Sequence, residues 1–188
     1  MNNSAGHFVP PVHIEILTAA HAPAYKPLRL EALRCFPQAF TSDYASALAH
    51  PVESYAARFT DTATGSFFLG AFDSQGHLVG SIGCEREARL QQHHCAHVVA
   101  MMVAPAAQRQ GVGRLLIDAC IARAATVPGL EQLTLTVTTS NAHAVRLYER
   151  AGFLAYGLLP RGIVVGGVGY DKLYMVRLLP ASPHLPTA

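Results

Sequence analysis

Two glycines stand close together just before a helical pattern, where they could leave backbone groups open to an anion. Gln108, Gly111 and Gly113 lie in the stretch "VAPAAQRQGVGRLLIDACIARA", which runs from Val103 to Ala124. A glycine has no Cβ, so the N–H groups beside it stay uncovered, and N–H groups at a helix N-terminus attract negative charge. The types and spacing of these residues therefore predict a diphosphate site.

Two common phosphate-binding patterns do not fit this stretch. A nucleotide P-loop needs Gly-Lys-Ser/Thr, whereas Gly113 is followed by Arg114 and Leu115. A dinucleotide fingerprint needs a third glycine at position 116, which is Leu116. On this segment alone, a glycine-assisted helix start without a ligand is an equally good interpretation.

A second segment, "NAHAVRLYERAGF" from Asn141 to Phe153, could supply a proton donor. Residues seven apart on an α-helix lie about two turns apart on nearly the same face. We therefore expect Asn141 and Tyr148 to point the same way, with the small Ala144 between them, and this face could line a narrow slot. Taken alone, Tyr148 is better explained as a core tyrosine that packs its ring and satisfies its hydroxyl.

The hydrophobic pattern embeds both segments in a single array of strands and helices. Strands are expected at 13–17, in a hairpin of "SFFLGAF" and "HLVGSIGCERE", at 97–104, at 132–138 and at "KLYMVRLL". Helices are expected after Thr18 with a start as late as Pro27, at 53–59, from 111 to about 125 and at "NAHAVRLYERAG", with "FPQAFTSDY" as a loop. We predict one domain over residues 13–180 between flexible tails at 1–12 and 181–188.

The order of strand, Gln-x-x-Gly-x-Gly and helix resembles the acetyl-CoA-binding motif of the GNAT N-acetyltransferase superfamily. That motif has Arg or Gln, two residues, Gly, one residue, and then Gly or Ala. The second segment resembles the superfamily's Asn-x-x-Ala-x-x-Leu-Tyr-x-x-x-Gly-Phe, and the matching residues are Asn141, Ala144, Leu147, Tyr148, Gly152 and Phe153. The resemblance extends to the first helix and loop, "KPLRLEALRCFPQAFTSDY", and to the closing strand "GYDKLYMVRL".

The resemblance implies an α/β (α+β) fold with a central mixed, mostly antiparallel twisted sheet of about seven strands, flanked by about four helices. It also implies that acetyl-CoA binds as a cosubstrate at the glycine-rich loop. The residues predicted to bind it are Met102, Val103, Gln108, Arg109, Gln110, Gly111, Val112, Gly113, Arg114 and Asn141. The backbone N–H groups from Gln108 to Arg114 would cradle its diphosphate.

The chemistry implied by the resemblance is a direct attack of a neutral amine on the thioester in a ternary complex, after which CoA leaves as a thiolate. N–H groups near Met102 and Val103 would polarise the thioester carbonyl, and Tyr148 would protonate the departing sulfur. A lysine-like amine has a pKa of about 10.4, so a base must deprotonate it. Glu85 is predicted as that base, directly or through water. Glu87 is the alternative, and both could instead form a solvated strand end.

The acceptor is predicted to be a primary amine of a small molecule or a peptide. From their positions in two loops, Phe40, Tyr44, Tyr170 and Asp171 are predicted to line its pocket. The alternative function is a non-catalytic acetyl-CoA-binding sensor or interaction module. Such a module would keep the glycine motif but would have no use for a proton donor at Tyr148.

The segment "HHCAH" contains four metal-ligand types, namely His93, His94, Cys95 and His97. No partner pair at a recognised spacing accompanies them, so we interpret the segment as a polar loop that leads into a strand and predict no metal. His143 falls at a variable position of the second motif and is expected at the surface.

Composition bounds the class of protein. Hydrophobic residues make up 51% and charged residues 14% of the 188 residues, which excludes a disordered chain. A net charge of +2 without a Lys/Arg block argues against a nucleic-acid or membrane partner. Four single cysteines, no signal peptide and no apolar run of transmembrane length predict a cytoplasmic protein with reduced thiols. The apolar content leaves room for a homodimer.

Overall fold

The computed structural model describes residues 12–60 and 64–180 of the chain. The predicted tails, 1–12 and 181–188, lie outside these ranges except for Val12. The strands are β1 His13–Ile16, β2 Phe67–Phe72, β3 Leu78–Arg86, β4 Cys95–Val103, β5 Gln132–Thr138, β6 Leu154–Val165 and β7 Val168–Leu178. The α-helices are α1 Ala22–Cys35, α2 Tyr44–Ala49, α3 Val52–Thr60, α4 Val112–Ala124 and α5 Ala142–Arg150, and short 3-10 turns include η2 Pro37–Ala39 and η4 Pro105–Ala107.

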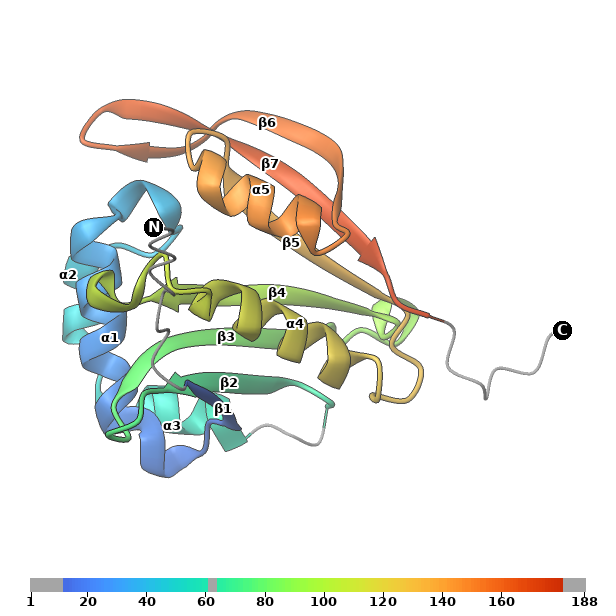
Figure 1. Cartoon of the computed structure of the whole chain (residues 1–188). Coiled ribbons are helices and arrows are strands. Elements are labelled where there is room, and N and C mark those ends of the chain that lie inside the picture. Colours follow the sequence, from blue (N-terminus) through green and yellow to red (C-terminus); the bar gives the residue numbers. More distant parts are fainter. Residues whose placement is uncertain (1–11, 61–63, 181–188) are drawn as a thin grey trace, which may run out of the picture.

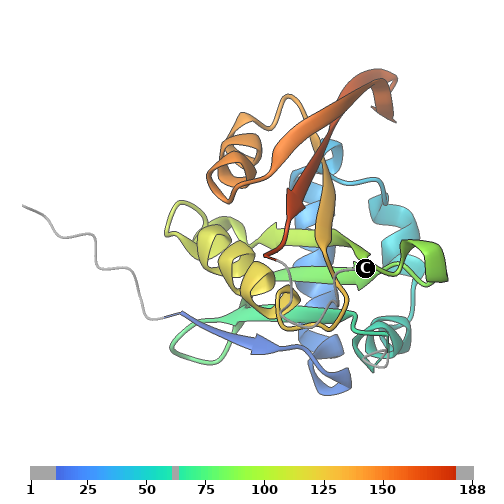
Figure 2. The ribbon, with the colours of Figure 1, turned by 90° about the vertical axis from the view of Figure 1, so that its right-hand side faces the viewer.

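The strands form a single sheet in the order β1-β2-β3-β4-β5-β7-β6. Every neighbouring pair is antiparallel except β4 and β5, which are parallel. The expected mixed, mostly antiparallel sheet is therefore confirmed. In Figures 1 and 2 the strands β5, β6 and β7 rise away from the group formed by β1 to β4.

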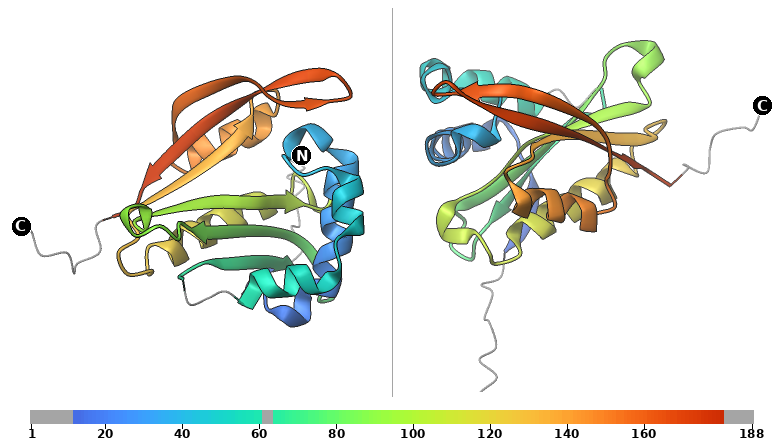
Figure 3. Two further views of the ribbon diagram at one scale, coloured as in Figure 1. Left: turned by 180° about the vertical axis from the view of Figure 1, so that it is seen from behind. Right: turned by 90° about the horizontal axis from the view of Figure 1, so that it is seen from above.

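Helices cover both faces of the sheet, because successive side chains of a strand point to opposite faces. On β3, Ile82 and Cys84 pack into a core shared with α4 and α5. A Cβ at Gly83, between them, would meet the ring of Phe68, which belongs to a second core shared with α1 and α3. Figure 3 shows α4 behind the strands when the molecule is seen from the side opposite to Figure 1.

The alternative helix start at Pro27 was wrong, and the short helix α2 was not predicted. Helix α1 begins at Ala22, and Pro27 lies inside it. Pro27 lacks an N–H, so the carbonyl of Pro23 loses its helical partner, but Pro23 is exposed and water can replace the missing donor. The expected loop "FPQAFTSDY" contains η2 and the cap of α2, where the Asp43 side chain accepts a hydrogen bond from the Ser46 N–H (2.8 Å).

Exposed apolar side chains gather on the β6–β7 hairpin. They are Leu154, Tyr156, Leu158, Leu159, Val164, Val168 and Leu178. β6 is an edge strand, so this hairpin is where a homodimer would find apolar surface, and the dimer stays a prediction. Among residues 12–60 and 64–180, the helices are too short or too polar for any of them to cross a membrane.

Candidate active site

β4 and β5 run parallel but pair over only three residues. The register joins 95–97 of β4 to 132–134 of β5, and beyond these rungs the two strands are not paired with each other. β4 continues beside β3, and β5 stays paired with β7 along its whole length. The two strands therefore diverge (Figure 1), and each presents an edge of backbone groups that no strand of the described chain covers.

A β-bulge lies in β4 where it diverges from β5. The register with β3 shifts between Ser81 and Gly83, and Ala100 has a left-handed φ of 51°. The Ser81 hydroxyl donates to the Ala100 carbonyl (3.0 Å), which ties the bulge to β3. Bulges re-aim backbone groups and recur beside active sites.

The end of β4 presents an amide to the unpaired edge. The Ala104 N–H donates to the Val79 carbonyl of the β3 segment (2.8 Å). Because backbone groups of successive strand residues point in opposite directions, the Val103 N–H points away from β3, whereas that of Met102 points toward it. Of the two amides predicted to hold the thioester, only that of Val103 faces the unpaired edge.

Five successive backbone amides are unpaired at the start of α4. The N–H groups of residues 109–113 donate to no other residue in the described ranges. The Gln108 N–H donates to the Pro105 carbonyl (3.3 Å) and the Arg114 N–H to that of Gly111 (2.9 Å), so the two outer amides of the predicted cradle are already used. The positive end of the helix dipole adds to the attraction for an anion.

Gly111 adopts a left-handed backbone conformation and leaves open space beside the loop. Its φ is +80°, and a Cβ there would find nothing within 4 Å. Arg109 also has a positive φ, of 61°, and alternation of this kind turns neighbouring amides toward one concave site. A Cβ on Gly113 would instead lie 3.4 Å from Leu147 and from Met101, so α4, α5 and β4 meet at this residue.

The glutamine side chains of the loop hold the loop itself. Gln108 Nε2 donates to the Val103 carbonyl (3.1 Å), and Gln110 Nε2 donates to the Ala106 carbonyl (2.8 Å). These bonds satisfy carbonyls at the turn between β4 and α4, so the two glutamines shape the site through its backbone.

Asn141 precedes α5 and does not lie inside it. Its Oδ1 accepts a hydrogen bond from the Ala144 N–H (3.1 Å), and its φ and ψ of −86° and 65° are not helical. The expectation that Asn141 shares a helix face with Tyr148 was therefore wrong, because the residue is the N-cap. Its side-chain NH₂ group donates to no described residue.

The Tyr148 side chain is 7% exposed, where α5 packs on the sheet. Its ring meets Phe153 edge to face, with 6.0 Å between the ring centroids. Burial raises the pKa of the Tyr148 hydroxyl, and the neighbouring Cys120 raises it further. In the part of the chain that the structure describes, no residue forms a hydrogen bond with this hydroxyl. The raised pKa keeps the hydroxyl protonated, and its O–H group is available to a ligand.

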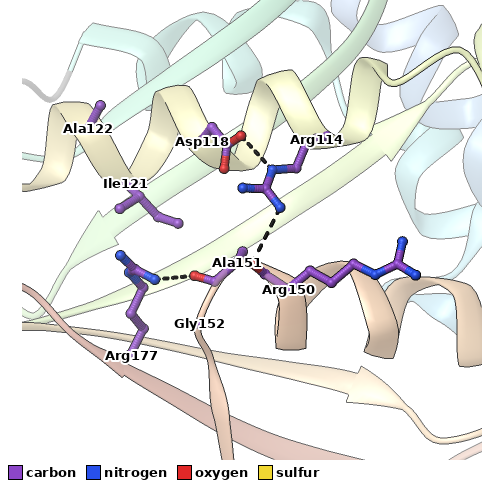
Figure 4. A pocket seen from close by; sticks show the side chains of 8 residues that line it. All are labelled: Arg114, Asp118, Ile121, Ala122, Arg150, Ala151, Gly152 and Arg177. Carbon is purple, nitrogen blue, oxygen red and sulfur yellow. Dashed lines mark hydrogen bonds and ion pairs between the residues drawn. The ribbon is translucent and has the colours of Figure 1, made fainter.

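Two arginines cap the C-terminus of α5 in a surface pocket of about 280 Å³ (Figure 4). Arg114 Nη1 donates to the Arg150 carbonyl (3.3 Å), while its Nε pairs with Asp118 (2.5 Å). Arg177, from β7, donates to the Ala151 carbonyl. The last carbonyls of a helix lack helical partners and carry partial negative charge, so these cations stabilise the helix end. The Arg114 side chain therefore serves α5, and not the glycine loop.

Glu85 and Glu87 line a second pocket, of about 380 Å³. By strand alternation from Gly83, Glu85 lies on the face opposite α4. Arg58 donates to Glu85 Oε1 through Nη2 (2.6 Å) and Nε (3.2 Å). Glu87 Oε1 lies 2.7 Å from Nε2 of His97, so each carboxylate is bound to a basic side chain.

His97 connects Glu87 to Thr134. Its Nδ1 lies 2.6 Å from Thr134 Oγ1, and His97 and Thr134 form the last paired rung before β4 and β5 diverge. An imidazole that donates from one nitrogen to a carboxylate can accept a proton at the other. From the sequence, His97 was interpreted as part of a polar loop that leads into a strand. Strand pairing brings His97 next to Glu87 and Thr134, and the residues adjacent to it in the sequence give no indication of this pairing.

The residues predicted to line the acceptor pocket lie on the segment from 40 to 44 and on β7, which a hydrogen bond from Lys172 to the Ala39 carbonyl brings together. Phe40 packs against the guanidinium of Arg29, 4.6 Å from its ring centroid, whereas Tyr44 begins α2 and is 39% exposed. Asp171 accepts a hydrogen bond from a backbone N–H of β6 (2.8 Å), so its carboxylate is used within the hairpin. Tyr170, beside it on β7, is half-buried.

Sequence reasoning missed two cations near this face, Arg29 and Lys172. Arg29 follows Tyr25 by four residues, so it lies next to the apolar face of the helix. A charged residue at such a position could have been identified from the sequence as a candidate binding residue. Lys172 is 4% exposed and donates to the Ala39 carbonyl (3.3 Å), and burial lowers its pKa. Its burial depends on the packing of η2 on β7, which local sequence does not reveal.

The four cysteines are free thiols, with Cys84 and Cys120 buried. Within residues 12–60 and 64–180, no three His, Cys, Asp or Glu side chains come together in a way that could hold a metal ion.

Comparison with known proteins connects this geometry to a family. A model of the Acetyltransferase (GNAT) family matches residues 27–153, more than half of the chain. A mycothiol acetyltransferase of Salinispora arenicola is 37% identical over 86 residues, which are 46% of this chain and 28% of that protein. A spermidine N(1)-acetyltransferase of Vibrio cholerae is 28% identical over 107 residues, 56% of this chain and 60% of that protein. This chain therefore spans less than two thirds of either relative.

A solved structure shares the fold. The phosphinothricin acetyltransferase (Pat) of Sinorhizobium meliloti, in complex with AcCoA, superposes with a TM-score of 0.78 at 18% identity, covering 94% of this chain and 93% of that one. At this identity the likeness establishes the fold alone.

We expect Arg177→Met to lower the free energy of unfolding by about 1–3 kcal/mol, because the buried Ala151 carbonyl would lose its donor. Urea unfolding followed by circular dichroism would measure the loss. Arg150→Met is the control, since that side chain points away from the pocket in Figure 4 and should change stability by less than about 0.5 kcal/mol. Equal losses in the two variants would contradict the capping role.

Proposed function

The chain belongs to the Acetyltransferase (GNAT) family, and from this premise we propose that it transfers the acetyl group of acetyl-CoA to a primary amine of a small molecule or peptide. The observation that carries the proposal is the set of five unpaired amides at the start of α4, beside the unpaired edges of β4 and β5. In the reaction, the amine nitrogen bonds to the acetyl carbon, the carbon–sulfur bond breaks, and the sulfur gains a proton.

The residues present suit acetyl-CoA. The unpaired amides of residues 109–113 can hold a diphosphate, and the space above Gly111 leaves room for it. The first turn of α4 contains no acidic residue that would repel it. The Val103 N–H, which faces the unpaired edge, can polarise a carbonyl as an oxyanion-hole donor does.

Tyr148 is proposed as the proton donor to the departing sulfur. Its raised pKa keeps the phenol protonated at neutral pH. A thiol has a pKa of about 8.5, well below that of a phenol, so the transfer needs a site that stabilises the phenolate. The positive N-terminus of α4 can contribute, because Leu147, the neighbour of Tyr148, touches Gly113 in the first turn of that helix.

Two side chains compete for the role of base. Glu85 is the base that the sequence predicts, but Arg58 occupies Oε1 of its carboxylate with two hydrogen bonds, so we favour His97 for the role. His97, between Glu87 and Thr134, can take a proton through the threonine hydroxyl and lies on the rung where the strands separate.

The function is tested by release of the CoA thiol from acetyl-CoA across pools of amines, amino acids, aminoglycosides and basic peptides. We expect acceptor-dependent release that falls about 100-fold in Tyr148→Phe, with unchanged acetyl-CoA binding, as for loss of a general acid. Tyr156→Phe, on exposed β6, is the control. Binding of acetyl-CoA without release from any pool would instead favour the sensor module.

Gly111→Glu should weaken acetyl-CoA binding by at least about tenfold, because it places a carboxylate where the diphosphate would lie. Gly76→Glu is a matched control: Gly76 has a φ of +82°, and a Cβ there also meets nothing within 4 Å, but it lies in the β2–β3 turn. Both variants therefore carry the same backbone strain. Calorimetric titration that gave equal affinities in the two would refute this placement of the diphosphate.

For the base, Glu85→Gln and His97→Asn separate the two candidates. Loss of the base should lower kcat/KM by about 100-fold in one variant only, and we expect that variant to be His97→Asn. A large fall in Glu85→Gln with little change in His97→Asn would restore Glu85 to the role. Steady-state rates at constant acceptor concentration make the comparison.

A further inference from the structure

The guanidinium of Arg29, on α1, has no hydrogen-bond partner in the described ranges. Its Nη1 is fully buried and unpaired. Nε and Nη2 are also unpaired but are not buried, so they remain within reach of a ligand. Buried polar groups are almost always paired, and those that carry charge cost the most when they are not.

Carboxylates do not neutralise this charge. Burial lowers the pKa of Arg29, and the neighbouring groups that act on it are Tyr25, Tyr55 and Arg58, none of them acidic at neutral pH. The Glu85 carboxylate is paired with Arg58, one of these neighbours. Arg29 is therefore a partly desolvated cation without a counter-ion in the described chain.

A second buried polar group lies on the same side of α1. Tyr25 is four residues before Arg29, so the two side chains are neighbours on the helix surface. The Tyr25 hydroxyl is fully buried, and the Ser81 hydroxyl lies within its reach as a hydrogen-bond partner. Burial raises the pKa of Tyr25, while the charge of Arg29 opposes the rise. The guanidinium of Arg29 is therefore the donor on this side of α1 that lacks an acceptor among the described residues, which points to an oxygen supplied from outside the chain.

The position of Arg29 connects it to the divergence of β4 and β5. Its guanidinium lies over the ring of Phe40, which follows η2. η2 is fastened to β5 by a hydrogen bond from Thr138 to the Gln38 carbonyl (2.6 Å) and to β7 by one from Lys172 (3.3 Å). Both bonds hold η2 to the β5–β7 half of the sheet, while the contact of Phe40 with Arg29 joins the segment to α1, which packs on β3 and β4. Arg29 therefore lies where the segment after η2 meets the other half of the sheet.

Lys172 adds a second cation beside this segment. It is 4% exposed, and its one hydrogen bond among the described residues goes to a backbone carbonyl. Two cations thus flank residues 37–40, and neither is paired with a carboxylate of the described chain. A cationic acceptor such as a polyamine would be repelled here, whereas an anionic group would relieve both charges.

We infer that the acceptor amine carries a carboxylate, which Arg29 binds, so that the substrate class is the amino acids. The planar guanidinium matches a carboxylate through two parallel hydrogen bonds, and the ring of Phe40 holds its plane. This inference rests on the proposed acetyl transfer. It adds that the carboxylate, and not only the amine, is recognised.

The test compares amino acids with their primary amides, which keep the amine and remove the negative charge. Rates of CoA release are expressed per unprotonated amine, because amidation also changes amine basicity. In the wild-type protein the acids should exceed the amides in kcat/KM. Arg29→Met should lower kcat/KM for the acids by about 10- to 100-fold, mainly through KM, and leave the amides unchanged.

Arg123→Met is the matched control. Arg123 also lies over a phenylalanine, with 5.2 Å to the centroid of the Phe67 ring, but on α4 and the other face of the sheet. It should leave both substrate classes unchanged. Arg29→Met should also fold with undiminished stability in urea, because it removes an unpaired charge and not a structural ion pair.

Two outcomes would overturn the inference: a wild-type preference for amides or polyamines, or an equal fall for acids and amides in Arg29→Met. If neither acids, amides nor polyamines release CoA, the acetyl transfer itself fails, and the substrate inference fails with it. Transfer to polyamines alone would keep the proposed function and reject the carboxylate.

Discussion

The site depends on the early loss of pairing between β4 and β5. Two parallel strands that stop pairing after three rungs leave backbone donors and acceptors in need of partners. The chain satisfies some of them locally: the Val103 carbonyl accepts from Gln108, and the Ala100 carbonyl of the bulge accepts from Ser81. Beside them, the Val103 N–H points to the unpaired edge, and the N–H groups of residues 109–113 donate to no other described residue. The end of β4 and the start of α4 therefore bring unpaired donors close together.

An interrupted sheet needs contacts that fix its two halves relative to each other. On one face, hydrogen bonds from Thr138 and Lys172 hold η2 to the β5–β7 half, and the contact of Phe40 with Arg29 joins the same segment to α1 on the other half. On the other face, α4 touches α5 at Gly113, and Arg114 of α4 with Arg177 of β7 holds the C-terminal carbonyls of α5. The position of Tyr148 on α5 is therefore determined by β4, α4 and β7 together. The arginines of the surface pocket have a structural role, because they hold the end of α5 in place.

Features determined by adjacent residues were readable from the sequence, and features determined by packing were not. The glycine loop was identified because a positive φ at Gly111 requires glycine, and β5 was bounded correctly because its alternation is regular. Asn141 was misassigned, since a cap and a helical residue differ by one position in the pattern. The environment of Arg29 depends on residues distant in sequence that meet only in the fold. Pro27 was misleading because proline disfavours a helix interior, but the packing of the buried face of α1 stabilises the helix through this position.

The net charge of the chain does not reveal the local electrostatics of the two faces of the sheet. These depend on how far individual donor groups are removed from water. The chain carries only +2 overall, and most of its surface charges are screened by water. The unpaired amides at α4 and the unpaired guanidinium of Arg29 lie on opposite faces of the same divergence and have the same polarity. The buried Nη1 of Arg29 lacks a partner among the described residues, which lowers the stability of the protein alone, whereas the amides of the exposed glycine loop can bind water. Under the proposed function, the diphosphate of acetyl-CoA would bind the amides on one side of the divergence and the carboxylate of the acceptor would bind Arg29 on the other, so that their reacting ends meet between the strands.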